Sequence, residues 1–211
     1  INIIQKYIDH SNQNENNIDW SLISRYQDLT EDFMEKYSDK LDWYWLSQEQ
    51  FMTLEFIARN IDLLDWEMLP TNSRISFLLN DGFVFLFQNK PIWNNIGHME
   101  KVTQECLEQY YDKIPENAWI DIFENKKLSI DFIKKYLNNN NCVSNDIWSS
   151  ISENVDLSIE FIDEFKDNLD WDILSTNYNF SKDNIIKYKK YLQLDSLSKN
   201  DIINDEYLDL I

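Results

Sequence analysis

The stretch "LDWDILS" occupies residues 169–175, and close variants of it recur along the chain. They read "IDWSLIS" at 18–24, "LDWYWLS" at 41–47 and "LDWEMLP" at 64–70. Seven tryptophans follow one another at spacings of 23, 23, 27, 26, 29 and 23 residues, namely Trp20, Trp43, Trp66, Trp93, Trp119, Trp148 and Trp171. A self-similar period of about 20–50 residues is typical of stacked repeat architectures.

The positions around each Trp predict two helices per copy. With Trp as position zero, position +3 is always aliphatic and position +10 is always Ser or Thr, as in Thr30, Thr53, Ser76, Thr103, Ser129, Ser158 and Ser181. A hydroxyl at this place predicts an N-cap, and apolar residues at +13, +14 and +17 trace one helical stripe. We therefore expect a second helix of roughly ten to twelve residues.

The Asp that precedes Trp in four copies (Asp19, Asp42, Asp65 and Asp170) is expected to cap a shorter first helix that carries the Trp. Neither helix can bury its apolar stripe alone, so the copies must stack, with each Trp as a core residue. Trp45 lies off the stripe and is expected at the surface. The extra residues of the longer copies fall after +17, in the connection between copies. The segment "DGFVFLFQNKPIW", residues 81–93, is expected to extend the third long helix and to end before Pro91.

These patterns predict an all-α fold, an α-solenoid of about seven two-helix repeats of 23–29 residues, with partial repeats at both ends. The repeats start near residues 18, 41, 64, 91, 117, 146 and 169, with a degenerate copy from residue 192, and together form a single domain over residues 1–211. At the start of the chain, Ile3, Ile4 and Tyr7 match positions +13, +14 and +17 of an earlier copy. Because the chain begins inside a repeat and without Met, we expect it to be a fragment of a longer protein.

Composition restricts the partners. The 211 residues are 43% hydrophobic, enough for a continuous core, and carry a net charge of -19. A chain this acidic repels phosphate backbones and anionic lipid, so we expect no nucleic acid and no membrane as partner, and favour a protein with a basic surface. The longest apolar run, "FVFLF" at 83–87, is too short to span a bilayer. With no secretion signal and two unpaired cysteines, an intracellular location is expected.

No residues in the sequence predict catalysis, a cofactor or a metal site. His10 and His98 are far apart, and no His/Cys spacing resembles a zinc site. Cys106 takes the +13 position and is expected in the core, whereas Cys142 lies in the polar stretch "NNNNCVSN". Only two glycines are present, and no phosphate-binding loop appears. The chain is therefore expected not to be an enzyme.

One set of side chains suggests a binding surface. Positions +12 and +19 lie on the face of the second helix opposite the apolar stripe, and they are mostly acidic. Stacked copies would align them in an acidic ridge, together with Trp45 as a candidate contact: Glu55, Asp62, Glu105, Asp112, Glu160 and Asp167. Two interpretations stay open, a solvated face and a docking strip for a basic partner.

The repeats "LDWDILS" 169–175 and "LDWYWLS" 41–47, with the following "LSIEFI" 157–162 and "LSIDFI" 128–133, resemble short Trp-anchored helical repeats in proteins of giant DNA viruses, mimivirus-like. The resemblance spans most of the chain. It implies an α-helical repeat protein of a large virus with an AT-rich genome, located in the host cytoplasm or the virion.

The function that we predict from the sequence is a non-enzymatic helical repeat scaffold that mediates protein–protein interaction. A structural component of a viral particle or assembly is the first alternative. An enzyme or ligand-binding domain with an unrecognised pocket is the second. The oligomeric state and the identity of the partner are open.

Overall fold

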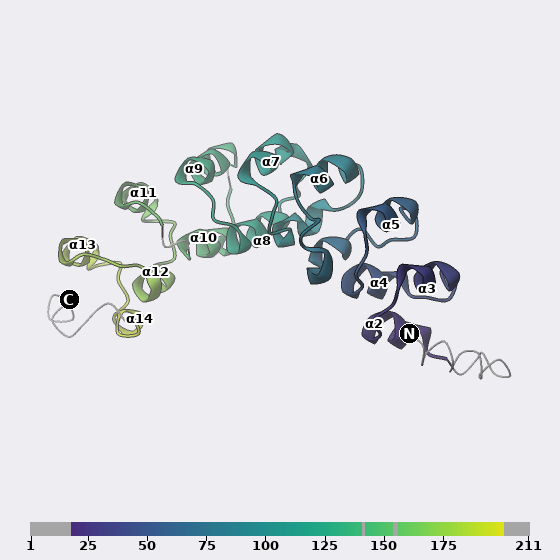
Figure 1. Cartoon of the computed structure of the whole chain (residues 1–211). Helices are drawn as coiled ribbons and strands as arrows, with labels where there is room; N and C mark the ends of the chain where they lie inside the picture. Colours follow the sequence, from purple (N-terminus) through teal and green to yellow (C-terminus); the bar gives the residue numbers. More distant parts are fainter. Residues whose placement is uncertain (1–17, 141, 154–155, 201–211) are drawn as a thin grey trace. The chain divides into compact units, whose positions relative to one another are not determined.

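A computed structural model describes residues 18–140, 142–153 and 156–200 of the chain (Figure 1). These residues form α-helices and 3₁₀-helices and no β-strand, with one isolated bridge between Asn80 and Lys101. The predicted all-α class is confirmed. The chain divides into two compact units, Ile1–Ala118 and Trp119–Ile211. None of the described helices is long and apolar enough to cross a membrane.

In most copies a first helix is followed along the chain by a second helix. The first unit contains, in order, α2 (Trp20–Tyr26), α3 (Glu31–Lys36), α4 (Trp43–Glu49), α5 (Leu54–Arg59), η2 (Leu69–Thr71), η3 (Ser73–Ile75), α6 (Asp81–Phe87), η4 (Trp93–His98), α7 (Gln104–Gln109) and η5 (Tyr111–Lys113). Helix α8 (Ala118–Asn125) begins at the boundary between the units. The second unit continues with α9 (Ile130–Asn139), α10 (Asn145–Ser152), α11 (Ile159–Phe165), α12 (Trp171–Asn177), α13 (Lys182–Tyr188) and α14 (Leu194–Leu197).

The predicted Asp caps are present. The carboxylate of Asp19 accepts a hydrogen bond from the backbone N–H of Leu22 at 3.0 Å, and Asp42 and Asp170 cap α4 and α12 in the same way. Asp65 also accepts backbone bonds, from Glu67 and Met68, but it starts a turn that leads into η2 rather than an α-helix.

The hydroxyl at +10 caps the second helix in six copies, through Thr30, Thr53, Thr103, Ser129, Ser158 and Ser181. Helices α3, α5 and α7 are shorter than predicted, with six residues each, whereas α9, with ten, has the predicted length. Beyond the end of the helix, the indole N–H of the next Trp donates to a backbone carbonyl. Trp43 Nε1 donates to the carbonyl of Ser38 at 2.8 Å, and Trp171 Nε1 donates to that of Lys166 at 2.7 Å.

The third copy departs from the predicted register. Ser76 lies in turns after η3, and the N-cap of α6 is Asn80, whose Oδ1 accepts from the N–H groups of Gly82 and Phe83 at 2.9 and 3.2 Å. Asn80 is followed by an acidic first-turn residue, Asp81, whereas Ser76 is followed by Phe77. The extra residues of this copy therefore lie between its two helices. Helix α6 in segment 81–93 is the second helix itself, not the extension of a helix that starts at Ser76, and it ends before Pro91 as predicted.

The core contains the residues that the pattern predicts. Position +3 is fully buried in most copies, as in Leu46, Leu69 and Leu174, and Cys106 is 4% exposed in the core. Trp66, Trp119, Trp148 and Trp171 are buried. The prediction of core burial is wrong for three tryptophans, which are only half-buried: Trp20, Trp43 and Trp93. Where the ring reaches solvent, a lysine covers it in two of them, Lys40 over Trp20 and Lys113 over Trp93.

In four copies a buried serine at +4 joins the first helix to the next copy, whereas the other three copies have Pro70, Gly97 and Phe123 at this position. The Ser175 hydroxyl donates to the carbonyl of Trp171 at 2.5 Å and accepts from the N–H of Gln193 at 3.0 Å. Ser24, Ser47 and Ser152 accept in the same way from the backbone N–H of the residue 18 positions later, at 2.8–2.9 Å. All four side chains are buried. The small residue expected here is therefore also a hydrogen-bonding element.

Packing follows the same order. In the first unit, α2 packs on α4, and α4 packs on η2 and η3; in the second, α10 packs on α12, and α12 on α14 (Figure 1). First helices thus contact the first helices of neighbouring copies. The degenerate eighth copy is described as far as α14, where Leu197 is fully buried. The expected partial copy with Ile3, Ile4 and Tyr7 lies outside the described residues.

Candidate binding surfaces

All six predicted carboxylates are exposed. Glu55, Asp62, Glu105 and Asp112 belong to the first unit, and Glu160 and Asp167 belong to the second. Within the described residues, the side chains of four of them form no hydrogen bond or ion pair, namely Glu55, Glu105, Asp112 and Glu160. The carboxylate of Asp62 lies 3.8 Å from Lys90 Nζ, and Asp167 accepts a hydrogen bond from the Tyr191 hydroxyl at 3.0 Å.

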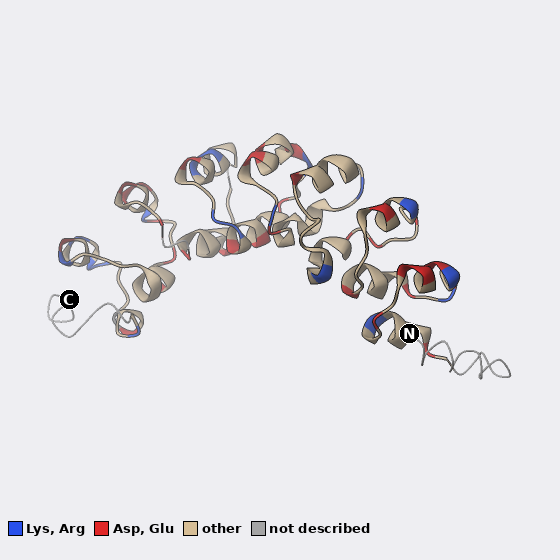
Figure 2. Ribbon diagram, viewed as in Figure 1, with Lys and Arg blue, Asp and Glu red and all other residues tan. Residues whose placement is uncertain are grey.

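Cations are interleaved with these acids. Figure 2 shows Lys and Arg beside Asp and Glu on α3 and α5. Ion pairs join neighbouring second helices, with Arg59 2.9 Å from Glu35 between α5 and α3, and Lys134 2.5 Å from Glu164 between α9 and α11. Exposed pairs of this kind contribute little to stability. Cations therefore lie between exposed carboxylates on this surface.

Asp163 links two neighbouring second helices through its carboxylate. Its carboxylate accepts from Lys187 Nζ at 2.6 Å and from the Tyr188 hydroxyl at 2.9 Å, which ties α11 to α13. These hydrogen bonds, that of Lys187 first, hold the pKa of Asp163 below its ordinary value. The same bond raises the pKa of Lys187. Burial and the carboxylate together raise the pKa of Tyr188. Each group keeps its usual charge at neutral pH, which is the behaviour of a structural link between helices.

Trp45 lies at the surface of α4 but is half-buried under Arg25. The guanidinium carbon of Arg25 is 3.8 Å from the centre of the Trp45 ring and 5.0 Å from that of Tyr26. Tyr44 meets Trp45 edge-on at 4.9 Å. The predicted contact residue is therefore one part of a group of aromatic side chains around one arginine.

Two further aromatic side chains were not predicted as surface residues. Phe51 and Phe77 are 47% and 48% exposed, and their rings stack at 6.2 Å. A sequence signal existed for Phe51, because position +8 is polar in every other copy: Asp28, Arg74, Lys101, Lys127, Asp156 and Asn179. Phe77 could not be identified in this way, because the second helix of the third copy starts later than predicted. Its position therefore has no equivalent in the other copies.

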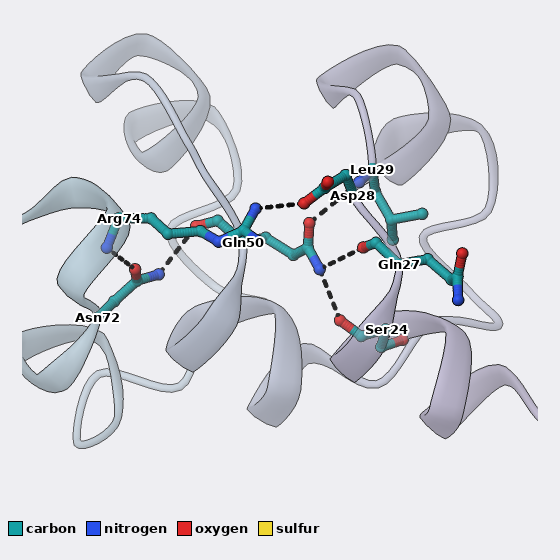
Figure 3. A network of polar contacts seen from close by, with 7 residues as sticks. All are labelled: Ser24, Gln27, Asp28, Leu29, Gln50, Asn72 and Arg74. Carbon is teal, nitrogen blue, oxygen red and sulfur yellow. Dashed lines mark hydrogen bonds and ion pairs between the residues drawn. The ribbon is translucent and has the colours of Figure 1, made fainter. Parts of the chain in front are cut away.

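Buried amides hold the loops that carry these residues (Figure 3). Gln50 Nε2 donates to the carbonyls of Ser24 and Gln27 at 2.9 and 2.7 Å, and its Oε1 accepts from the N–H of Leu29 at 3.1 Å. One copy later, Asn72 Nδ2 donates to the carbonyls of Ser47 and Gln50 at 2.8 and 2.9 Å. Each amide thus satisfies carbonyls at the end of the preceding first helix.

These buried amides, here called the amide ladder, are accompanied by an ion pair between the first and third copies. Arg74 Nη1 lies 2.6 Å from Asp28 Oδ1, although the two residues are two copies apart (Figure 3). In the second unit, Asn200 Nδ2 repeats the amide contact, with the carbonyls of Ser175 and Tyr178 at 3.2 and 3.0 Å. The residue that precedes Phe51, Gln50, is therefore held by buried hydrogen bonds to the preceding copy.

Two open hollows lie on the second unit. One, of about 310 Å³, is lined by charged side chains that include Lys127 and Glu153. Its one serine, Ser150, donates its hydroxyl to the carbonyl of Asp146 and has no basic partner there. The other, of about 350 Å³, lies beside Trp148. In the described part of the chain, no three His, Cys, Asp or Glu side chains gather as a metal site would require.

Comparison of the chain with models of known families, with curated proteins and with solved structures finds no match.

Proposed function

We propose that this chain is a non-enzymatic helical repeat scaffold, an α-solenoid of about seven two-helix repeats, that binds another protein. The recurring bonds support the solenoid. In both units the serine at +4 receives a backbone N–H from the next copy, and a first helix packs on the next first helix. A copy whose hydrogen bonds are completed only by its neighbour is the unit from which such arrays are built.

The observation that carries the proposed binding role is two groups of aromatic side chains in the first unit, here together called the aromatic surface. One group is Tyr26, Tyr44 and Trp45 around Arg25, and the other is the stacked pair Phe51 and Phe77. Almost all large exposed apolar side chains of the described residues belong to this unit, and Ile186 is the exception. Exposed apolar clusters mark interaction sites, and aromatic side chains with Arg supply most binding energy at interfaces. The amide ladder underneath holds the surface in one conformation, which lowers the entropic cost of binding.

The proposed partner is a protein with a basic surface. Glu55, Glu105 and Asp112 belong to the same unit, are exposed, and have no ion-pair partner among the described residues. Such carboxylates speed the encounter with a cationic partner. The net charge of -19 disfavours nucleic acid and anionic membranes as alternatives.

The test starts with a partner recovered by affinity capture from the source cell and purified. Phe51→Ser combined with Phe77→Ser should raise the dissociation rate at least about tenfold, which corresponds to about 1.4 kcal/mol, because hot-spot aromatics act mainly on dissociation. Phe85→Ser is the matched control: Phe85 is 62% exposed on α6, outside the aromatic surface, and its loss should leave binding unchanged. Equal effects of both variants would contradict the proposed surface.

The carboxylates are tested by kinetics. Replacement of Glu105, Asp112 and Glu160 by Lys should slow association and reduce its salt dependence, with little change in dissociation. These three side chains are exposed, so the fold should persist. An association rate that is unchanged and independent of salt would assign these carboxylates to solvation alone.

A second candidate is a structural component of a viral particle or assembly, in line with the resemblance to giant-virus repeats. The aromatic surface favours it to the same extent, because a second copy of the chain can cover the same side chains. The native mass in solution separates the two. A monomer favours the scaffold for another protein, and an oligomer broken by the Phe51→Ser and Phe77→Ser pair favours assembly.

A further inference from the structure

A pair of aromatic rings recurs in the copies, and in three of them a lysine of the chain itself covers it. In the fourth copy Lys113 Nζ lies 5.5 Å from the ring of Trp93 and 5.7 Å from that of Tyr110. Lys40 lies 5.6 Å from Trp20, and Lys90 lies 5.5 Å from Trp66. An ammonium group within about 6 Å of a ring centre is attracted by the negative face of the ring.

The covering residue occupies one place in the repeat. It stands 20 residues after Trp, or 24 in the third copy, where four extra residues precede α6. In the seventh copy this place holds Tyr191, which stacks on Trp171 at 4.8 Å. In the sixth copy it holds Asn168. The rings of Trp148 and Phe165, 5.6 Å apart, form the usual aromatic pair there. Within the described residues, no cation lies over either ring.

A hollow of about 350 Å³ is found at this place. Trp148, Phe165 and Asn168 are among the residues that line it. Asn140, Cys142 and Val143 also line it. They belong to the copy with the longest spacing in the chain, 29 residues from Trp119 to Trp148. Trp148 itself is mostly buried, at 8% exposure, so the more accessible Phe165 supplies much of the aromatic wall.

Polar groups at the rim suit an ammonium or guanidinium ion. Asn138, Asn140 and Asn168 line the hollow, and their amide oxygens are hydrogen-bond acceptors. Asn140 Nδ2 donates to the carbonyl of Tyr136 at 2.7 Å, which fixes the direction of that side chain. No Lys or Arg lines the hollow.

We propose that this hollow binds a lysine or arginine side chain of a partner protein, in the place that the chain's own lysine takes in three other copies. The cation stacks on Phe165 and Trp148 and donates hydrogen bonds to the asparagine oxygens. The proposal rests on the proposed function only for the source of the cation. The site itself can be tested without any partner.

The first experiment uses the intact chain labelled with ¹⁵N and the probe Nα-acetyl-lysine methylamide at fixed ionic strength. The indole resonance of Trp148 is assigned by its loss in Trp148→Phe. A saturable shift of this resonance is expected, with smaller shifts at the indoles of Trp20, Trp66 and Trp93, where a lysine is already in place. Nα-acetyl-norleucine methylamide, which lacks the ammonium group, should give no saturable shift.

The second experiment fills the site from within. Asn168→Lys should place an ammonium over the rings, as Lys113 does in the fourth copy, and should abolish the shift of Trp148 caused by the probe. Asn179→Lys adds the same charge at an exposed residue outside the hollow and should leave the shift unchanged. Asn168→Gln keeps the amide and should retain binding.

Three results would overturn the proposal: no saturable shift at Trp148, equal shifts at all indoles, or full binding by Asn168→Lys. The outcome is separable from that of the proposed function. A partner that binds the aromatic surface while the lysine probe fails removes this site alone. A probe that shifts Trp148 in a chain that captures no protein keeps the site and removes the scaffold role.

Discussion

At the scale of the residue, the serine at +4 does more than allow close approach. Ser175 joins the carbonyl of Trp171 to the N–H of Gln193 in the next copy, inside the core. Removal of this hydroxyl leaves buried backbone groups without a partner, which is costlier than the loss of an exposed bond. The sequence predicts a small residue here, and only the structure shows that its oxygen bridges two copies.

We expect Ser175→Ala to lower the free energy of unfolding by about 1–3 kcal/mol. Thr176→Ala is the control, because Thr176 bonds only within its own helix, to the carbonyl of Asp172. That change should stay within about 0.5 kcal/mol. Urea denaturation measures both, with the slope m unchanged. Equal effects of the two variants would show that the bridge between copies is unimportant.

The buried amide of Gln50 had no clear signal in the sequence. The amide stands at position +7 in Gln50 and at position +6 in Asn72 and Asn200, so no single offset identifies all three. A residue that caps a neighbouring copy is selected by three-dimensional contact, which an offset count cannot detect. The acidic candidates differ, because all six are exposed as predicted. The predicted helix face is correct only for Glu55, Glu105 and Glu160, since α5, α7 and α11 end before Asp62, Asp112 and Asp167.

Gln50→Leu should cost at least about 2 kcal/mol of stability, because two carbonyls and the N–H of Leu29 lose their partner. Gln27→Leu is the matched control, since the Gln27 side chain is exposed and only its backbone carbonyl joins the network. Thermal unfolding followed by circular dichroism compares the two. A stable Gln50→Leu chain would mean that water replaces the amide.

At the scale of the element, the third copy shows where periodicity misleads. Position +10 predicts Ser76 as the N-cap, but Asn80 begins the helix. A start at Asn80 buries Phe83, Val84 and Phe87 together on one face. Burial of large side chains outweighs a capping bond of about 1 kcal/mol. The helix type was thus predictable, and its start was not.

The two possible N-caps of α6, Asn80 and Ser76, predict opposite effects of substitution on stability. Asn80→Ala should lower stability by about 1 kcal/mol, because the N–H groups of Gly82 and Phe83 lose their acceptor. Ser76→Ala should be nearly neutral. Chemical denaturation of both variants decides the matter, and a larger loss for Ser76→Ala would restore the register predicted from the sequence.

The contact between α11 and α13 should depend on pH. The folded chain holds the pKa of Asp163 below its ordinary value, so the folded state binds fewer protons than the unfolded state. The stabilisation is therefore present above the ordinary Asp value of about 4 and is lost as pH falls through the folded pKa.

Asp163→Asn removes this carboxylate. The difference in stability between the natural chain and the variant should be small, because the ion pair is solvated. It should also shrink as pH is lowered from 6 to 3. Urea midpoints across this range provide the measurement, and a difference that grows on acidification would assign the wrong sign to the pKa shift.

At the scale of the whole molecule, the Trp series predicted a stack of similar copies, and the structure places their contacts inside two compact units. The sequence could not predict this division. The spacing of the tryptophans shows where insertions occur. How strongly two adjacent copies stabilise each other depends on the side chains that they bury together, which only the structure shows. The partner is unpredictable for a similar reason, because surface composition favours a class of ligand without selecting one.

The division predicts that stability is local. Trp171 is 9% exposed in the second unit, and Trp171→Ala should cost about 3–5 kcal/mol. In stacked repeats each copy contacts mainly its neighbours, so the loss should lower hydrogen-exchange protection in α10, α12 and α13 and leave that of α2 to α5 nearly unchanged. Trp66→Ala, in the first unit, should give the reverse pattern. Equal loss of protection throughout the chain after either change would show that the two units unfold as one cooperative body.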